Sequence, residues 1–369
     1  MGKPLNVGII GCGAIIAQYL ATFPSLTHVR LVAVADLDLA RAQAVADTLT
    51  GVRAIAVSEL IEAPDIDVVL NLTIPAAHAE ISLAATAAGK SVYGEKPLAA
   101  SLDAGREMVD AAAKAGLRLG CAPDTVLGSG VQTARHVIDS GTIGAPIAAT
   151  ATMATPGHER WHPNPDFYYL PGGGPLLDMG PYYVTALVTL LGHVTSVVGS
   201  ASRTRGERII GSGPREGERV PVSTDSHVTG ILTHESGALS TLIMSFDSVK
   251  SSAANIEIHG ELGSMLVPDP NHFAGDTQVF LLGADEWQTV PPSAGITDGA
   301  RGIGLDDMAA EIIAGATYLN SHRANGDLAF HVLDVMESLL TSAHEDRRVT
   351  VSSTAVRPAA VPYSSLDAG

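Results

Sequence analysis

The sequence has few cysteines and few basic residues, and both shortages restrict the classes of protein to which it can belong. Cys12 and Cys121 are the only cysteines among 369 residues, too few for a disulfide framework. Lys and Arg number 22 against 39 for Asp and Glu, which gives a formal net charge of −17. An acidic surface repels nucleic acid and anionic membranes, so we expect neither as a partner.

Long apolar runs are also absent from the sequence. No stretch reaches the length that spans a bilayer, and residues 1–4 lead into a strand-like segment, so we expect no signal peptide. With so little cysteine, this pattern predicts a cytoplasmic location. The composition, 46% hydrophobic and 17% charged, is typical of a globular protein of two or more domains.

The N-terminal segment predicts a strand, a glycine turn and a helix. The apolar run at residues 5–10 ends in Gly11-Cys12-Gly13, and residues 14–21 have helical spacing. These are the first two glycines of a G-x-G-x-x-G pattern, whose third position is occupied by Ile16. Such a turn lets a dinucleotide pyrophosphate approach a helix N-terminus. We expect cofactor contacts from Gly11, Gly13, Ala14 and Ile15.

Asp36 follows the next predicted strand, residues 31–35. An acidic residue there accepts hydrogen bonds from the adenosine ribose and repels a 2′-phosphate, which favours NAD over NADP. The alternative is that Asp36 caps the helix predicted at residues 40–49, although Asp38 could fill that role instead.

Strands and helices then alternate as far as residue 121. The strands are predicted at 67–72, 91–94 and 117–121, and the helices at 78–88 and 102–115. This alternation predicts an α/β fold with a doubly wound parallel sheet, ending near Ala122-Pro123-Asp124. Strand ends in such sheets bind ligands. The further residues expected near the cofactor are Thr73, Pro75, His78, Glu95 and Lys96, although a histidine such as His78 more often packs or caps.

Lys96 lies in Gly94-Glu95-Lys96-Pro97, directly after a predicted strand. Pro97 restricts the backbone of the residue before it, so the ammonium group has a defined direction. The alternative is a strand end with a solvated charge pair.

After residue 125 the pattern changes. Helices are predicted at 130–140, 175–191, 305–318 and 328–342, and strands at 148–154, 220–222, 228–233, 239–246, 255–259, 264–267, 277–282 and 348–351. Turn signals between the strands predict a large, mostly antiparallel sheet. We therefore expect a cofactor domain at 1–124, a substrate domain at 125–351, and a loose C-terminal arm at 352–369.

Asp178 and Tyr182 lie four residues apart in GGGPLLDMGPYY, so on a helix they share a face. A carboxylate beside a phenol can orient it for proton transfer. The alternative is that Asp178 caps the helix and Tyr182 packs, and Pro181 should kink or restart the turn.

The loop His158-Glu159-Arg160-Trp161-His162 matches the zinc motif H-E-x-x-H. Zinc binding by that motif requires a helix, and the prolines at 156, 163 and 165 predict a loop, so we expect no metal. The loop is interpreted as substrate-facing, with Trp161 as a platform for a sugar ring and His158 and His162 as hydroxyl partners. Asp124, at the domain boundary, is added to the expected substrate contacts.

The glycine turn, Asp36, Glu95-Lys96-Pro97 and GGGPLLDMGPYY together resemble the Gfo/Idh/MocA family of NAD(P)-dependent oxidoreductases. The resemblance implies a Rossmann domain, then an α/β domain whose open sheet forms a homodimer or homotetramer. It also implies catalytic roles for Lys96 and Asp178. Tyr182 stands where many members have histidine, and is similar to the tyrosine of glucose–fructose oxidoreductase and dihydrodiol dehydrogenase.

The function expected is hydride transfer between NAD and a secondary alcohol of a sugar, cyclitol or glycoside. Lys96 and Tyr182 would handle the hydroxyl proton, and Asp178 would orient them. Two alternatives remain open. One is a tightly bound cofactor recycled within one turnover, as in an oxidoreductase-type transferase or a redox-assisted glycosidase. The other is a non-catalytic ligand sensor on the same fold.

Overall fold

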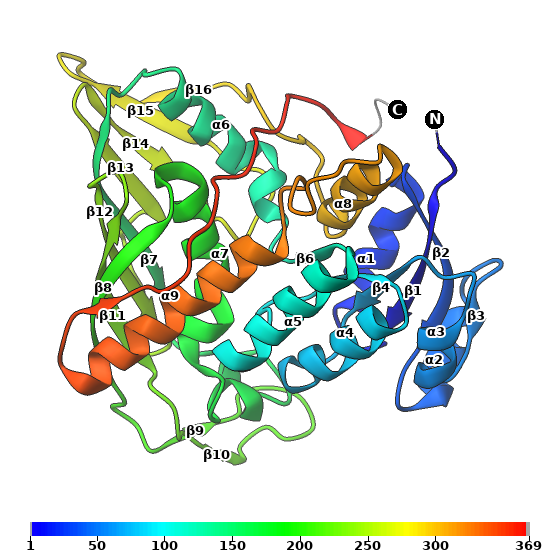
Figure 1. Ribbon diagram of the computed structural model, residues 1–369. Coiled ribbons are helices and arrows are strands. Elements are labelled where there is room, and N and C mark those ends of the chain that lie inside the picture. Colours follow the sequence, from blue (N-terminus) through cyan, green and yellow to red (C-terminus); the bar gives the residue numbers. More distant parts are fainter. Residues whose placement is uncertain (1, 367–369) are drawn as a thin grey trace. The chain divides into compact units, whose positions relative to one another are not determined.

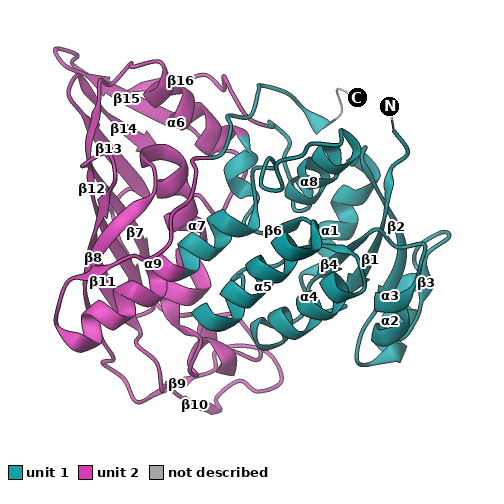
Figure 2. Cartoon of the chain, viewed as in Figure 1, with its two compact units in different colours: residues 1–128, 296–333, 358–369 teal, residues 129–295, 334–357 magenta. Residues whose placement is uncertain are grey.

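The computed structural model describes residues 2–366, which form two compact units (Figure 2). Unit 1 comprises the chain up to residue 128, residues 296–333 and the chain from residue 358 onward. Unit 2 comprises residues 129–295 and 334–357. The sequence pattern led us to expect continuous domains with boundaries at 124 and 351. The units are instead interleaved, because the chain returns to unit 1 twice.

Unit 1 contains a six-stranded parallel sheet of order β3-β2-β1-β4-β5-β6, the order typical of a Rossmann fold. The order reverses between β1 and β4, and at this switch point α/β sheets bind ligands beyond the strands' carboxyl ends. The strands are β1 (Leu5–Ile10), β2 (Val29–Ala35), β3 (Arg53–Ala54), β4 (Val68–Asn71), β5 (Ser91–Gly94) and β6 (Leu119–Cys121).

In unit 1, α5 begins and ends at the predicted residues, whereas α3 was not predicted. Ser101 caps α5 by accepting a hydrogen bond from the Ala104 N–H, and Gly116 ends it in the left-handed conformation. α4 and α5 lie side by side (Figure 1). The helices are α1 (Ile16–Thr22), α2 (Leu39–Ala46), α3 (Val57–Glu62), α4 (His78–Ala87), α5 (Leu102–Ala115) and α8 (Ile303–Ile313).

Unit 2 contains a nine-stranded sheet of order β16-β15-β14-β13-β7-β12-β11-β8-β17. All its ladders are antiparallel except β7 with β12, so the prediction of a mostly antiparallel sheet is confirmed. The strands are β7 (Pro146–Ala154), β8 (Val194–Ser202), β11 (His227–His234), β12 (Leu239–Ser245), β13 (Ile256–Gly260), β14 (Gly263–Val267), β15 (Thr277–Leu281), β16 (Gln288–Val290) and β17 (Val349–Thr350).

Two helices pack on this sheet: α6 (Ser129–Asp139) against β14 and β15, and α7 (Gly174–Leu191) against β7, β11 and β12. α7 runs through Pro181 without a break, so the predicted restart was wrong. Its C-terminal half is buried on all sides, and this packing stabilises the helix despite the missing N–H. The long α9 (Gly326–Glu345) passes from unit 1 to unit 2 after Leu333.

A small hairpin, β9 (Glu207–Ile209) with β10 (Arg219–Pro221), extends from unit 2 between β8 and β11. Its residues hold the loop at 156–173. Gly211 N–H donates to the Glu159 carbonyl, and Arg215 forms a bidentate pair with Asp166. The hairpin therefore serves as a frame for the loop predicted to face substrate.

The chain after residue 351 is more ordered than the expected loose arm. The carboxylate of Asp334 accepts hydrogen bonds from the backbone N–H groups of Ser352 and Ser353, and Ser364 forms a β-bridge with Ile296. Residues 367–369 of the predicted arm lie outside the described residues. Within residues 2–366, no helix has the length and apolar character needed to cross a membrane.

Candidate functional site

The glycine turn of unit 1 joins β1 to α1. Gly11 has a φ of +104°, and a Cβ built on it would lie 2.6 Å from the carbonyl carbon of Leu72, so this position requires glycine. Gly13 differs, because an added Cβ there meets nothing within 4 Å. Gly13 and Ala14 are exposed and Ile15 is half-buried. The turn therefore presents an open cradle directly before a helix N-terminus.

Asp36 lies at the end of β2 beside this turn. Its Oδ2 accepts a hydrogen bond from the Cys12 N–H at 2.8 Å, and its Oδ1 accepts one from the Asp38 N–H at 2.9 Å. The helix cap is Asp38, whose side chain accepts from the Ala40 N–H. The alternative role of Asp36 as that cap is therefore wrong. A carboxylate has about four lone-pair sites, so Asp36 retains acceptor capacity for ribose hydroxyls.

The turn after β5 holds Glu95 and Lys96. Glu95 is buried; its Oε1 accepts from the Tyr19 hydroxyl at 2.8 Å and its Oε2 accepts from the Lys96 N–H at 3.0 Å. Lys96 is half-buried, and its peptide bond to Pro97 is cis. Both carboxylate oxygens of Glu95 thus hold this turn.

His78 supports the same turn from the start of α4. Its Nδ1 lies 2.7 Å from the Pro97 carbonyl oxygen, and its Nε2 lies 3.1 Å from that of Thr73. Only 2% of His78 is exposed, and burial lowers its pKa, while each ring nitrogen lies within hydrogen-bond distance of a backbone carbonyl oxygen. The expected cofactor contact from His78 is therefore corrected: the side chain joins two loops that face the ligand edge of the sheet.

The loop after β4 carries the other expected cofactor contacts. Thr73 donates through its N–H and its hydroxyl to Oδ1 of the fully buried Asn71. Pro75 begins a short 3₁₀ turn, and Ile74 between them is 70% exposed. Asn71 also donates to the His78 carbonyl, so one buried amide fixes both ends of this loop.

Asp124 is not available to a substrate. Its side chain is fully buried, and its Oδ2 accepts hydrogen bonds from the backbone N–H groups of Gly302 and Gly304 at the start of α8. Burial raises its pKa, and the nearby Arg301 partly opposes that effect. We correct the expectation: Asp124 joins the end of β6 to α8.

In unit 2, the two expected catalytic residues lie on α7. Asp178 is half-buried and Tyr182 is buried, one helical turn apart as predicted. The structure thus places Asp178 and Tyr182 together on one helix of unit 2, whereas Lys96 belongs to unit 1.

The H-E-x-x-H segment is a short 3₁₀ turn, His158–Arg160, rather than an α-helix. Nε2 of His158 lies 3.1 Å from Oδ2 of Asp178, so the Nε2 side of this imidazole contacts the protein. Trp161 is 58% exposed, as a platform would be. His162 accepts a hydrogen bond from the Asn164 N–H, and burial lowers its pKa.

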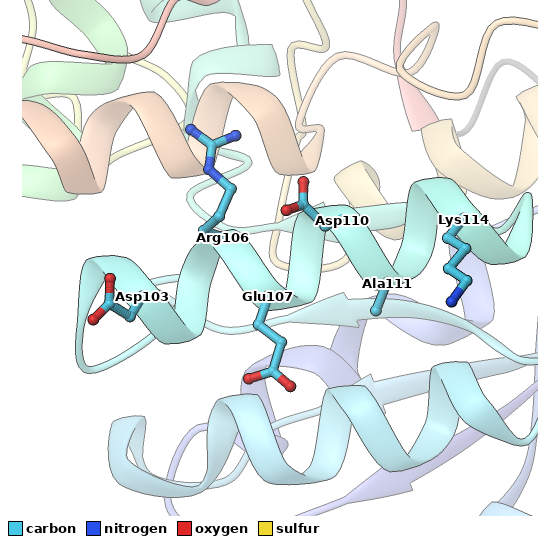
Figure 3. A pocket seen from close by; sticks show the side chains of 6 residues that line it. All are labelled: Asp103, Arg106, Glu107, Asp110, Ala111 and Lys114. Carbon is cyan, nitrogen blue, oxygen red and sulfur yellow. The ribbon is translucent and has the colours of Figure 1, made fainter.

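A hollow of about 420 Å³ lies on the surface of α5 (Figure 3). Arg106 points away from Glu107 in this view, and its guanidinium lies 4.0 Å above the Phe330 ring. Opposite charges at helical spacing are typical of a solvated helix face, whereas a binding site would bring polar side chains together around a ligand. The lining residues are Asp103, Arg106, Glu107, Asp110, Ala111 and Lys114.

Comparison with known proteins agrees with this geometry. A family profile described as "Oxidoreductase family, NAD-binding Rossmann fold" matches residues 5–122, and a "GFO/IDH/MocA C-terminal domain" profile matches residues 131–266. A 1,5-anhydro-D-fructose reductase of Ensifer adhaerens is 30% identical over 264 residues, which cover 70% of this chain and 74% of that enzyme. The chain belongs to the Gfo/Idh/MocA family.

Two further relatives of this Gfo/Idh/MocA protein are informative. An inositol 2-dehydrogenase of Ralstonia nicotianae is 40% identical over 153 residues, covering 39% of this chain and 44% of that enzyme, so the match spans less than half of the relative. The crystal structure of an NAD-binding oxidoreductase from Klebsiella pneumoniae is 25% identical, with a TM-score of 0.79, covering 95% of this chain and 99% of that one.

The residues of unit 1 fit the NAD that this family binds. The open space above Gly13 accommodates a pyrophosphate against the start of α1, and Asp36 provides a ribose acceptor at the end of the adjacent strand. The position that faces the ribose 2′ carbon in such folds is held by the acidic Asp36. The nearby basic residue, Arg41, is paired with the Asp36 carboxylate, with 3.7 Å between Nη1 and Oδ1. The cofactor of this Gfo/Idh/MocA protein is therefore NAD.

Sequence reasoning missed four supporting residues of the family site. Tyr19 and Asn71 hold the two loops of unit 1, while Arg208 and Tyr169 hold the loop of unit 2. Each acts through a partner far away in the sequence or through backbone groups. No local spacing marks such residues, and only their type, polar within apolar segments, could have drawn attention to them.

Proposed function

We propose that the protein oxidises a secondary alcohol of a sugar, cyclitol or glycoside with NAD, or catalyses the reverse reduction. The observation that carries the proposal is the open glycine cradle beside Asp36, on the same sheet edge as the turn bearing Lys96. The names of two relatives, an inositol dehydrogenase and an anhydrofructose reductase, support the substrate class.

The proposed roles follow from side-chain chemistry. NAD, when bound, would supply the hydride acceptor. In unit 1, Gly11, Gly13 and Asp36 would hold the cofactor, and Lys96 would polarise the substrate hydroxyl as a positioned cation. In unit 2, Asp178 would orient the proton-transfer group next to it. Tyr182 shares the face of α7 with Asp178 and completes the proposed catalytic set. Trp161 and His162 face the rest of the substrate from the loop.

The test is a panel of polyols, cyclitols and glycosides incubated with NAD and followed by NADH absorbance. We expect turnover of at least one member, abolished in Lys96→Met. Tight NAD binding without turnover of any substrate would instead favour the sensor alternative, and NAD that survives dialysis would favour a cofactor recycled within one turnover.

We also propose a homo-oligomer formed through the face of the nine-stranded sheet opposite α7. Val198 and Ile231 are cross-strand neighbours on that face and are 37% and 45% exposed. Ile231→Lys should lower the particle mass measured by light scattering. Leu282→Lys, at an 83% exposed position directly after β15, should leave that mass unchanged.

A further inference from the structure

The imidazole of His158 is held against the carboxylate of Asp178. The distance from Nε2 to Oδ2 is 3.1 Å, and the two side chains are only 12% and 16% exposed. Because a carboxylate only accepts, Nε2 carries the hydrogen of this bond. The lone pair of the neutral ring is then on Nδ1, where it can accept a proton.

Aromatic rings fix the plane of the His158 imidazole. Its centroid lies 4.4 Å from that of Phe246, 4.7 Å from that of Tyr168 and 5.1 Å from that of Trp161. Two of these contacts are edge-on and the third is tilted. A ring packed in this way keeps one orientation, so Nδ1 has a defined direction.

A buried ionic network fixes the backbone of His158. Its N–H donates to the Tyr169 hydroxyl at 3.2 Å, and that hydroxyl donates to the Glu159 carboxylate. Arg208, on β9, is 1% exposed and donates to Glu159 at 3.1 Å and to Asp247 at 2.6 Å. A buried cation with two carboxylate partners is expensive to disrupt, so the loop has little freedom at this point.

We propose that His158 is the proton acceptor of the reaction, with Asp178 fixing its tautomer and stabilising the imidazolium. This inference rests on the proposed dehydrogenase function. The O–H bond of the carbinol would break and its proton would pass to Nδ1 as the C=O bond forms; NAD, when bound, would supply the acceptor for the hydride that leaves with the C–H electron pair. Solvent then takes the proton. An imidazole suits this step because its ordinary pKa, about 6.5, is far nearer neutral pH than the about 10 of a phenol.

Several charged or titratable groups surround His158. They come from α7, the loop, β9 and the segment after β12. They are Asp178, Glu159, His162, Tyr168, Tyr169, Arg208 and Asp247. The pH profile must therefore be compared between variants that keep this set unchanged.

The first experiment examines the apoprotein by ¹⁵N NMR of its histidine rings. We expect His158 in the Nε2–H form, and Asp178→Asn to shift that resonance toward mixed tautomers. His193, which pairs with Glu235 at 3.2 Å on the opposite end of α7, should not respond and provides a matched control. A His158 ring that is insensitive to Asp178→Asn overturns the proposal.

The second experiment measures kinetics with the best substrate of the panel. His158→Phe, which retains the ring packing, should lower kcat by about 10² at pH 7 and remove the acid limb of the kcat/KM profile. Added imidazole should restore part of the activity of His158→Ala. His193→Gln should behave like the wild type in both the rate and the profile.

The outcomes separate the two proposals. If the wild type oxidises no member of the panel, the proposed function fails and this inference fails with it. If the wild type is active and His158→Phe stays within threefold of it, only the inference fails. A slow His158→Ala with an unchanged profile and no response to imidazole would make His158 a structural residue and would also overturn the inference.

Discussion

Oδ2 of Asp36 accepts a hydrogen bond from the Cys12 N–H at 2.8 Å, which joins the end of β2 to the glycine turn after β1. The ribose acceptor and the pyrophosphate cradle are thus fixed relative to each other before any cofactor binds. Asp38, two residues later, caps α2 by accepting a hydrogen bond from the Ala40 N–H. Asp38 therefore caps the helix, and Asp36 is left for the ribose contact that we propose.

We predict that Asp36→Ala weakens NAD binding about 10- to 100-fold, because a hydrogen bond to a charged group contributes about 1.5–3 kcal/mol. It should also improve NADP binding, since the repelling charge is lost and Arg41 is released. Asp38→Ala is the control, which should reduce stability by about 1 kcal/mol without changing cofactor preference. Calorimetric titration with both cofactors measures this; a wild type that prefers NADP would contradict the assignment.

The two glycines of the turn should separate folding from binding. Gly13→Ala should leave the melting temperature unchanged, since its Cβ enters open space, yet weaken NAD binding by intruding on the pyrophosphate. Gly11→Ala should destabilise the fold, because its Cβ would collide with the backbone of Leu72 at a φ of +104°. Equal NAD affinity of Gly13→Ala and the wild type would remove the pyrophosphate from this turn.

Lys96→Met retains much of the side-chain volume and removes the positioned cation. We expect kcat to fall by about 10² or more while NAD affinity changes little, because the pyrophosphate contacts lie in the glycine turn. Tyr182→Phe tests the phenol separately. If Tyr182 moves the proton with Lys96, the double variant should be little slower than either single one. Near-normal kcat in Tyr182→Phe would limit that residue to shaping the pocket.

The Trp161 platform is tested by KM. Trp161→Ala should raise KM several-fold with a smaller effect on kcat, since we propose that the exposed indole contacts parts of the substrate that do not react. Trp287, which is 38% exposed and lies 5.6 Å from Phe280 near β16, provides the control, and its alanine variant should leave KM unchanged. A KM unaffected by Trp161→Ala would place the substrate elsewhere.

Much of unit 1 could be predicted from the sequence because its signals are local. Apolar runs of strand length, a serine cap and a C-terminal glycine are each read within one element, and β1, β5 and α5 have the predicted bounds. The glycine turn and Asp36 follow from the same local pattern. Spacing of this kind reports on secondary structure and on residues at strand ends.

The contacts of the unit 2 loop could not be predicted in this way. Arg208 and Glu159 are 49 residues apart and His158 and Asp178 are 20 apart, and the members of each pair lie on different elements. Periodicity gives no direction to side chains on such a loop. The same limit applies to Asp124, whose backbone partners are Gly302 and Gly304, about 180 residues away. Tertiary packing alone decides whether these groups face a ligand or the protein.

The last prediction concerns acid stability, and it rests on His322 in unit 1. This ring is 1% exposed, with Nε2 3.1 Å from the Leu119 carbonyl oxygen; burial, and then the charge of Arg118, lowers its pKa to about 4. An unfolded histidine has a pKa near 6.5, so the unfolded chain binds a proton first as the pH falls. The stability due to neutral His322 is complete above pH 6.5 and is lost between pH 6.5 and 4.

At pH 5 this loss amounts to about 2 kcal/mol for His322 alone. His322→Gln keeps a donor for the Leu119 carbonyl and has no such proton uptake. Its drop in unfolding free energy from pH 7 to pH 5, measured by urea denaturation, should therefore be about 2 kcal/mol smaller than that of the wild type. The buried His78 and His234, whose pKa values burial also lowers, leave the variant a residual slope. His272→Gln, at a side chain 70% exposed, is the control and should follow the wild type. Equal drops in His322→Gln and the wild type would mean that His322 is protonated in the folded protein at pH 5.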